Sequence, residues 1–99
     1  MKVVTICGSM KFQKEMREIA SKLELEKKYV VIQCVYFSKN QTLTNSDIKL
    51  LSKLHYKKID ISDAIYVVNV NGYIGESTKK EIEYAQSLKK EILSYEPLN

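Results

Sequence analysis

Residues 64–85, AIYVVNVNGYIGESTKKEIEYA, contain an apolar run, a glycine-rich turn and a helical pattern in that order. The β-branched run 64–70 predicts a buried strand, and the letters NGYIG that follow it mark a turn. From Thr78 to about Lys90 the apolar residues return at helical spacing. This order predicts a strand-turn-helix unit of the kind from which parallel sheets are built.

The same alternation of β-branched runs and helical spacings extends to both sides of this unit. The further predicted elements are a strand at 3–7, a helix beginning near Phe12, a strand at 29–37, a loop at 38–42, a helix after a Thr44–Asp47 capping box, and a strand at 91–96. Near-continuous apolar strands that alternate with helices imply a parallel sheet covered on both faces. We therefore expect one α/β domain over residues 1–99, a small three-layer Rossmann- or flavodoxin-like fold with about four strands in the order 2-1-3-4.

The composition of the chain indicates which kinds of partner this domain can bind. The chain has 99 residues, is 44% hydrophobic and carries 16 Lys and Arg against 12 Asp and Glu, which gives a net charge of +4. The lysines are scattered beside glutamates and Arg17 is the only arginine, so binding of a nucleic-acid polymer is not expected.

The first apolar run is too short for a signal peptide or a membrane span, which predicts a cytoplasmic protein. A core this small also makes a homo-oligomer, a dimer or larger, an expected state.

The two cysteines give no sign of a metal site. Cys7 and Cys34 end two predicted strands, without a CxxC pattern or a histidine at ligand spacing. We therefore predict no metal, no cofactor and no disulfide framework. Burial as small apolar residues is the favoured reading of both, and a reactive thiol at Cys7 is the alternative.

Two loops are expected to meet at the carboxyl edge of the sheet, where parallel α/β folds bind ligands. Each loop holds glycine and hydroxyl residues before a helix, whose free N–H groups attract anions. The predicted phosphate- or substrate-binding residues are Gly8, Ser9, Met10, Asn71, Gly72, Tyr73, Glu76, Ser77 and Thr78. For Ser9, a plain helix cap is the competing interpretation.

Two ionisable residues are the catalytic candidates. Glu81 completes a T-x-x-E capping box with Thr78, but its helical spacing to Ala85 also places it along the buried side of the helix, where desolvation would raise its pKa. His55 lies on the apolar side of the predicted second helix. It is either a half-buried structural histidine or an acid or hydrogen-bond donor.

Three segments carry a family resemblance: VTICGSMKF (4–12), IDISDAIYVVN (59–69) and GYIGESTKKEIEYA (72–85). They resemble the nucleoside 2-deoxyribosyltransferase superfamily, which includes the deoxynucleoside 5′-monophosphate N-glycosidases, and the likeness runs from residue 3 to about 95. Members of the family place a glutamate nucleophile in a G-x-x-x-E-hydrophobic-G-x-A segment. The resemblance implies that Glu81 attacks C1′ of the sugar, expels the base and passes the glycosyl group to water or to another base.

The chain also departs from the family pattern. His55 stands eight residues before Asp63, where the enzymes commonly carry an aspartate, and residues 77–80 replace glycines at the helix start. The chain is shorter than most characterised members as well. Three hypotheses follow: a nucleoside or nucleotide N-glycosidase or 2-deoxyribosyltransferase, a protein that binds a nucleotide or ADP-ribose-like signal without turnover, and an interaction protein with no small ligand.

Overall fold

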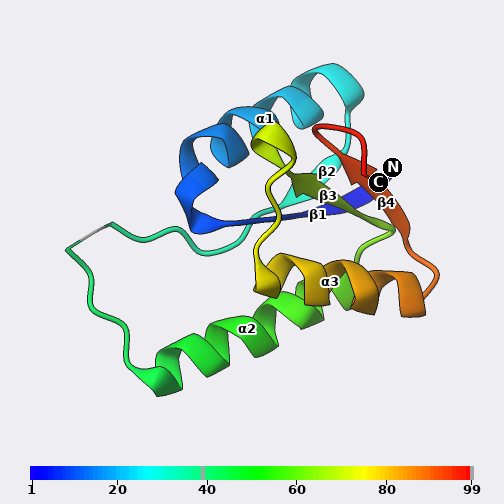
Figure 1. Cartoon of the computed structure of the whole chain (residues 1–99). Helices are drawn as coiled ribbons and strands as arrows, with labels where there is room; N and C mark the ends of the chain where they lie inside the picture. Colours follow the sequence, from blue (N-terminus) through cyan, green and yellow to red (C-terminus); the bar gives the residue numbers. More distant parts are fainter. Residues whose placement is uncertain (39, 99) are drawn as a thin grey trace.

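Four parallel strands form one sheet in the order β2-β1-β3-β4, which is the order that the sequence predicts. The computed structural model describes residues 1–38 and 40–98, so Asn99 and Lys39, which belongs to the predicted loop 38–42, lie outside the described residues. Figure 1 shows how the helices connect the strands. The elements are β1 (Val3–Gly8), η1 (Met10–Phe12), α1 (Gln13–Lys27), β2 (Val30–Ile32), α2 (Asn45–Asp60), β3 (Ala64–Val68), η2 (Val70–Gly72), α3 (Glu76–Ser87) and β4 (Glu91–Ser94).

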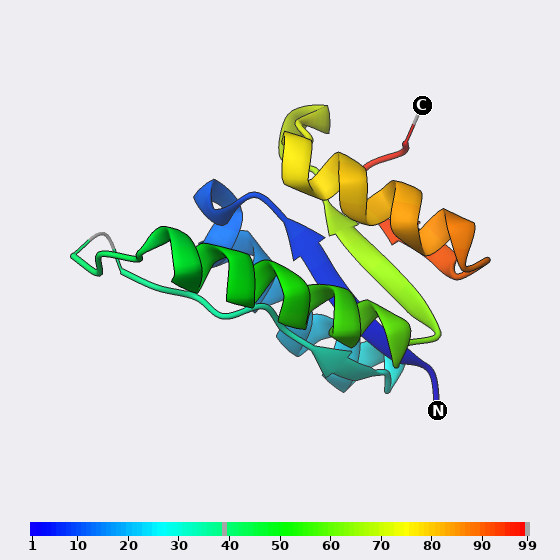
Figure 2. The same cartoon turned by 90° about the horizontal axis from the view of Figure 1, so that it is seen from below.

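The sheet separates two apolar clusters, with α1 on one face and α2 and α3 on the other (Figure 1 and Figure 2). Side chains alternate along a strand, so Ile6 of β1 packs with α1 while the adjacent Cys7 packs with α2 and α3. The chain changes face between β1 and β3, whose carboxyl ends are neighbours at Gly8 and Val68. The expected three-layer α/β fold is therefore confirmed.

The second strand is shorter than predicted and covers Val30–Ile32 instead of 29–37. It is an edge strand that pairs with β1 over three residues. Beyond Ile32 the chain leaves the sheet, and the Lys58 ammonium donates a hydrogen bond of 2.9 Å to the Gln33 carbonyl oxygen. β-Branched composition indicates a strand but does not show where its neighbour diverges from it.

The third helix begins before the predicted Thr78 and ends before Lys90. Its N-cap is Gly75, and Glu76 in the first turn interacts favourably with the positive end of the helix dipole. Thr78 is therefore buried inside the first turn, and the predicted Thr78–Glu81 capping box is wrong. At the other end, Lys89 has a left-handed φ of 59° and turns the chain into β4.

The capping box of α2 is confirmed and provides a stability test. The Asp47 N–H donates to the Thr44 hydroxyl at 3.0 Å, and the Asp47 carboxylate accepts a hydrogen bond from the Thr44 N–H at 3.0 Å. We expect Thr44→Ala to lower the free energy of unfolding by about 1 kcal/mol, measured by urea unfolding. Thr42→Ala is the matched control because Thr42 is exposed and precedes the helix. An equal loss in both variants would contradict the role of the cap.

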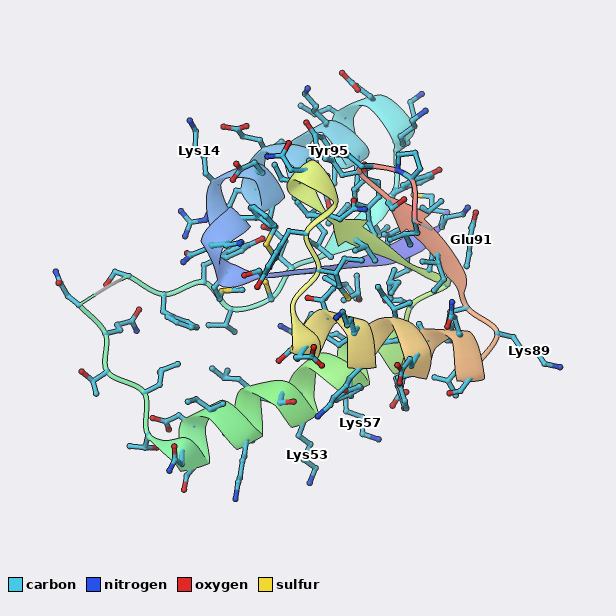
Figure 3. All side chains as sticks on the ribbon, viewed as in Figure 1. Lys14, Lys53, Lys57, Lys89, Glu91 and Tyr95 are labelled. Carbon is cyan, nitrogen blue, oxygen red and sulfur yellow. The ribbon has the colours of Figure 1, made fainter. Side chains whose placement is uncertain are left out.

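The surface lysines are spread over separate elements. Lys14 of α1, Lys53 and Lys57 of α2, and Lys89 after α3 all point away from the body of the domain (Figure 3). These four side chains do not converge on one patch. In the described part of the chain, no helix combines the length and the apolar character needed to cross a membrane.

Candidate functional site

A cavity of about 390 Å³ lies between α2, the first turn of α3 and the segment that follows β2. This volume is in the range of small-molecule sites. Gly8 and Ser9 border it, which places it at the carboxyl end of β1, as expected for this fold. The lining consists of Gly8, Ser9, Met10, Cys34, Val35, Phe37, Leu43, Ile48, Leu51, Ser52, Leu54, His55, Lys58, Gly75, Glu76, Ser77, Thr78 and Glu81.

All but three of the predicted site residues line this cavity, including Glu81 and His55. The three exceptions are Asn71, Gly72 and Tyr73. They belong to η2 and the residue after it, where the Asn71 N–H donates to the Glu96 carboxylate at 2.6 Å. The ring of Tyr73 packs edge-on against Phe12, with ring centroids 5.9 Å apart. These contacts direct the η2 turn away from the cavity.

The apolar wall of the cavity was not predicted as part of the site. Ile48, Leu51 and Leu54 follow a helical spacing that normally indicates a core-facing side, yet Ile48 is 53% exposed and Leu54 is 45% exposed. Of the α2 residues, only His55 and Ile59 are buried. The apolar side of α2 therefore faces the cavity along its first turns and reaches the core only near its end.

Asp63, the aromatic residues after β2, and Ser9 each make contacts with nearby parts of the fold. Asp63 accepts a hydrogen bond of 2.8 Å from the Val3 N–H, so its carboxylate has a structural role just before β3. Of the two aromatic residues that follow β2, Phe37 lines the cavity, whereas Tyr36 packs with the α1 cluster. Ser9 is the N-cap of η1, and its hydroxyl accepts from the Lys11 N–H at 3.4 Å.

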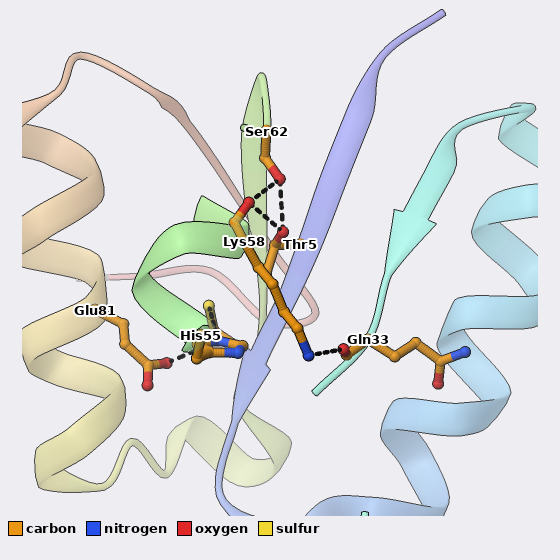
Figure 4. A network of polar contacts seen from close by, with 7 residues as sticks. Thr5, Gln33, His55, Lys58, Ser62 and Glu81 are labelled. Atoms are coloured by element: carbon orange, nitrogen blue, oxygen red, sulfur yellow. Dashed lines mark hydrogen bonds and ion pairs between the residues drawn. The ribbon is translucent and has the colours of Figure 1, made fainter. Parts of the chain in front are cut away.

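Three ionisable side chains from different elements meet beside the cavity, and two of them, His55 and Glu81, line it. The Nε2 atom of His55 on α2 lies 3.4 Å from the Cys7 Sγ on β1 and 3.5 Å from the Glu81 Oε1 on α3. Figure 4 shows the Glu81 carboxylate pointing across to the His55 ring. The donor atoms of all three residues lie within 4.8 Å of one another. Sequence spacing missed this cluster because its members are far apart along the chain.

Burial determines the protonation of the cluster. Desolvation raises the pKa of Glu81 to about 7, even though a hydrogen bond with the Cys7 thiol lowers it. Desolvation, together with the positive charge of Lys58, lowers the pKa of His55 to about 4. The imidazole is therefore neutral at pH 7, and its contact with Glu81 is a polar contact between a neutral ring and a carboxyl group rather than an ion pair. Burial also raises the pKa of the Cys7 thiol well above its ordinary value.

A second polar network holds the end of α2 in place beside β1. The Thr5 hydroxyl donates to the Lys58 carbonyl oxygen at 3.0 Å, and the Ser62 hydroxyl donates to the same oxygen at 2.7 Å. The two hydroxyls lie 2.6 Å apart (Figure 4). Because His55 is one turn before Lys58, this network also sets the position of the imidazole.

The first turn of α3 supplies a polar edge to the cavity. Gly75 caps the helix without a side chain, so no cap side chain occupies the N–H groups of the first turn. Gly75, Glu76, Ser77 and Thr78 all border the cavity. An anionic group bound there would interact with N–H donors and with the positive end of the helix dipole.

Comparison with known proteins supports the fold. No protein-family model matches the sequence, and no curated protein matches it. A crystal structure of a conserved protein from Enterococcus faecalis V583 is similar to this chain, with a TM-score of 0.64 and 13% sequence identity. The match covers 95% of this chain and 62% of the Enterococcus protein, so this chain spans less than two thirds of the length of that protein. At this identity the likeness shows the α/β fold alone.

Proposed function

We propose that the protein cleaves or transfers the N-glycosidic bond of a nucleoside or nucleotide, with Glu81 as the nucleophile. The observation that carries this proposal is the position of the Glu81 carboxylate. Its side chain is 15% exposed, lines a cavity of ligand size and lies 3.5 Å from the His55 ring. A poorly solvated carboxylate is a stronger nucleophile than one surrounded by water.

The reaction follows the logic of retaining glycosidases. The Glu81 carboxylate attacks C1′ of the sugar, the bond from C1′ to nitrogen breaks, and the base leaves with the bonding electron pair and takes up a proton. The glycosyl ester on Glu81 is then attacked by water or by a second base, which restores the carboxylate. His55 has no charge at neutral pH, so it acts here as a positioning residue, with its Nε2 3.5 Å from the carboxylate oxygen of Glu81.

The cavity offers complementary regions for such a ligand. The side chains of Phe37, Leu51 and Leu54 supply an apolar wall for a base. The first turn of α3, with Ser77 and Thr78, supplies N–H and hydroxyl donors for a sugar or a 5′-phosphate.

Binding without turnover is the second candidate function. The donors of the α3 first turn and the apolar wall do not involve Glu81, so they can hold a nucleotide or an ADP-ribose-like group even where no reaction follows. The residues that replace family glycines at positions 77–80 favour this alternative. It predicts that a nucleotide raises the melting temperature equally in the wild type and in Glu81→Gln.

Base release distinguishes the two functions. Metal-free protein is incubated with deoxynucleosides, their 5′-monophosphates, ribonucleotides and NAD-related compounds, and the free base is measured by chromatography. Release that requires Glu81 supports the proposed enzyme and identifies its substrate. A thermal shift without release supports binding alone. Neither release nor a shift from any compound contradicts both and supports an interaction protein.

We also expect the protein to form a homodimer or a larger oligomer. The apolar side chains Val35, Ile48 and Leu54 of the cavity lining and Leu50 of α2 are between 45% and 54% exposed, and self-association would cover part of this surface. Light scattering at micromolar concentration measures the state. A monomer at that concentration would contradict this expectation.

A further inference from the structure

We infer that Cys7, His55 and Glu81 form a binding site for a divalent zinc-class cation, with one coordination position open to the cavity. This inference goes beyond the proposed glycosyl transfer and does not depend on it. The three residues offer one sulfur, one nitrogen and one oxygen ligand, all of which Zn²⁺ accepts.

The distances between the ligand atoms suit tetrahedral coordination. Bonds of about 2.3 Å to sulfur and about 2.0 Å to nitrogen and oxygen, at tetrahedral angles, place sulfur and nitrogen about 3.5 Å apart and nitrogen and oxygen slightly closer. The observed separations are 3.4 Å from Cys7 Sγ to His55 Nε2 and 3.5 Å from His55 Nε2 to Glu81 Oε1. The third separation is within 4.8 Å, and rotation of the Glu81 side chain can shorten it.

The His55 ring cannot form good hydrogen bonds to both of its neighbours in the cluster at once. The Nε2 atom of His55 carries either one hydrogen or one lone pair, so it bonds well with only one of its two neighbours. The 3.5 Å separation from the Glu81 oxygen is longer than an ordinary N–H···O bond of about 2.7–3.2 Å. A cation at the centre would satisfy the sulfur, nitrogen and oxygen atoms together.

Charge balance also favours a divalent cation. The Cys7 thiolate and the Glu81 carboxylate contribute two negative charges and the neutral imidazole none, so Zn²⁺ makes the buried cluster neutral. Among the described residues that line the cavity, Lys58 is the only lysine or arginine, and its ammonium donates a hydrogen bond of 2.9 Å to the Gln33 carbonyl oxygen. On binding, Zn²⁺ displaces the proton of the Cys7 thiol and any proton on Glu81 into solution.

The geometry also predicts how the metal affects the proposed reaction. His55 and Glu81 line the cavity, whereas Cys7 lies behind them, so the open coordination position faces the bound ligand. A Glu81 oxygen that coordinates Zn²⁺ is not free to attack C1′. Zinc binding and glycosyl transfer should therefore exclude each other.

Cobalt titration tests the site directly. Co²⁺ added to the reduced, metal-free wild type should bind at one equivalent with a thiolate-to-cobalt charge-transfer band and the intense visible bands of tetrahedral cobalt, and Zn²⁺ should displace it. Cys7→Ser should remove the charge-transfer band. In competition with a chelator, Cys7→Ser and His55→Gln should each weaken Zn²⁺ binding at least about 100-fold. Cys34→Ser and Glu83→Gln are the matched controls and should bind as the wild type does.

Each outcome is decisive. No thiolate signature in the folded wild type, or a signature lost in Cys34→Ser instead of Cys7→Ser, overturns the inference, whether or not the variants fold. Cobalt binding with the expected signature but no base release from the metal-free protein supports the metal site and contradicts the proposed enzyme. Base release that saturating Zn²⁺ does not change, while the cation occupies Cys7, overturns the mutual exclusion.

Discussion

Replacement of Glu81 by glutamine should lower the rate of base release at least about 1000-fold in the metal-free protein. Glutamine keeps the size of the side chain, so the variant retains the cavity and the contact with His55. It lacks a carboxylate that can form the glycosyl ester. Single-turnover rates with the substrate found in the base-release panel measure the effect.

The matched control is Glu83→Gln, two residues along the same helix and exposed to solvent. It makes the same change of charge but should leave the rate within about twofold of the wild type. Nucleotide binding, followed by thermal shift, should be retained in both variants because the α3 first turn is unchanged. Equal rates in Glu81→Gln and the wild type would exclude Glu81 as the nucleophile.

The fold could be predicted from the sequence because the patterns that indicate its elements are local. The β-branched runs at 3–7 and 64–70 and the helical spacings between strands depend on neighbouring residues, and the Thr44–Asp47 capping box depends on two residues three positions apart. The right-handed connection rule then limits the strand order to few possibilities. Prediction failed where distant contacts decide the outcome, as at β2, whose end depends on where β1 diverges and on the Lys58 side chain.

The candidate site was also predicted where local patterns decide it and missed where distant contacts do. Local patterns placed Glu81 along the buried side of the third helix and His55 on the apolar side of the second. The capping-box pattern at Thr78 suggested a structural use of Glu81 that the observed helix start at Glu76 rules out. The proximity of Cys7 to both residues could have been found from strand alternation, because Cys7 points to the face opposite Ile6 and therefore toward α2 and α3. Ligand spacing along the chain cannot reveal a cluster assembled from three separate elements.

The burial of Glu81 should also make the stability of the fold depend on pH. Desolvation raises the pKa of the Glu81 carboxyl from an ordinary value of 4.5 to about 7, so the folded protein holds this proton more strongly than the unfolded chain does. The stabilisation from this proton is fully present below pH 4.5 and is lost as the pH rises through 7. The loss amounts to about 3 kcal/mol.

His55 has the opposite effect in the wild type. Its pKa is lowered from 6.5 to about 4, so its contribution to stability is present above pH 6.5 and is lost as the pH falls through 4. The two contributions partly cancel between pH 4.5 and 6.5, which hides the effect of Glu81 in the wild type alone. Burial and Lys58, which lower the pKa of His55, are both retained in Glu81→Gln, so the change with pH of the difference between the two proteins reports on Glu81.

We therefore expect Glu81→Gln to gain stability relative to the wild type as the pH rises from 4.5 to 8, by up to about 3 kcal/mol. Urea unfolding at pH 4.5 and pH 8 with a chelator measures this gain, because a cation on Glu81 would remove the effect. Glu83→Gln should show the same difference from the wild type at both pH values. A gain for Glu81→Gln that does not change with pH would mean that the carboxylate is solvated in the folded protein. That result would remove the main physical reason for its reactivity, whereas the expected rise shows that the protein keeps a destabilising buried carboxylate where a neutral amide would be more stable.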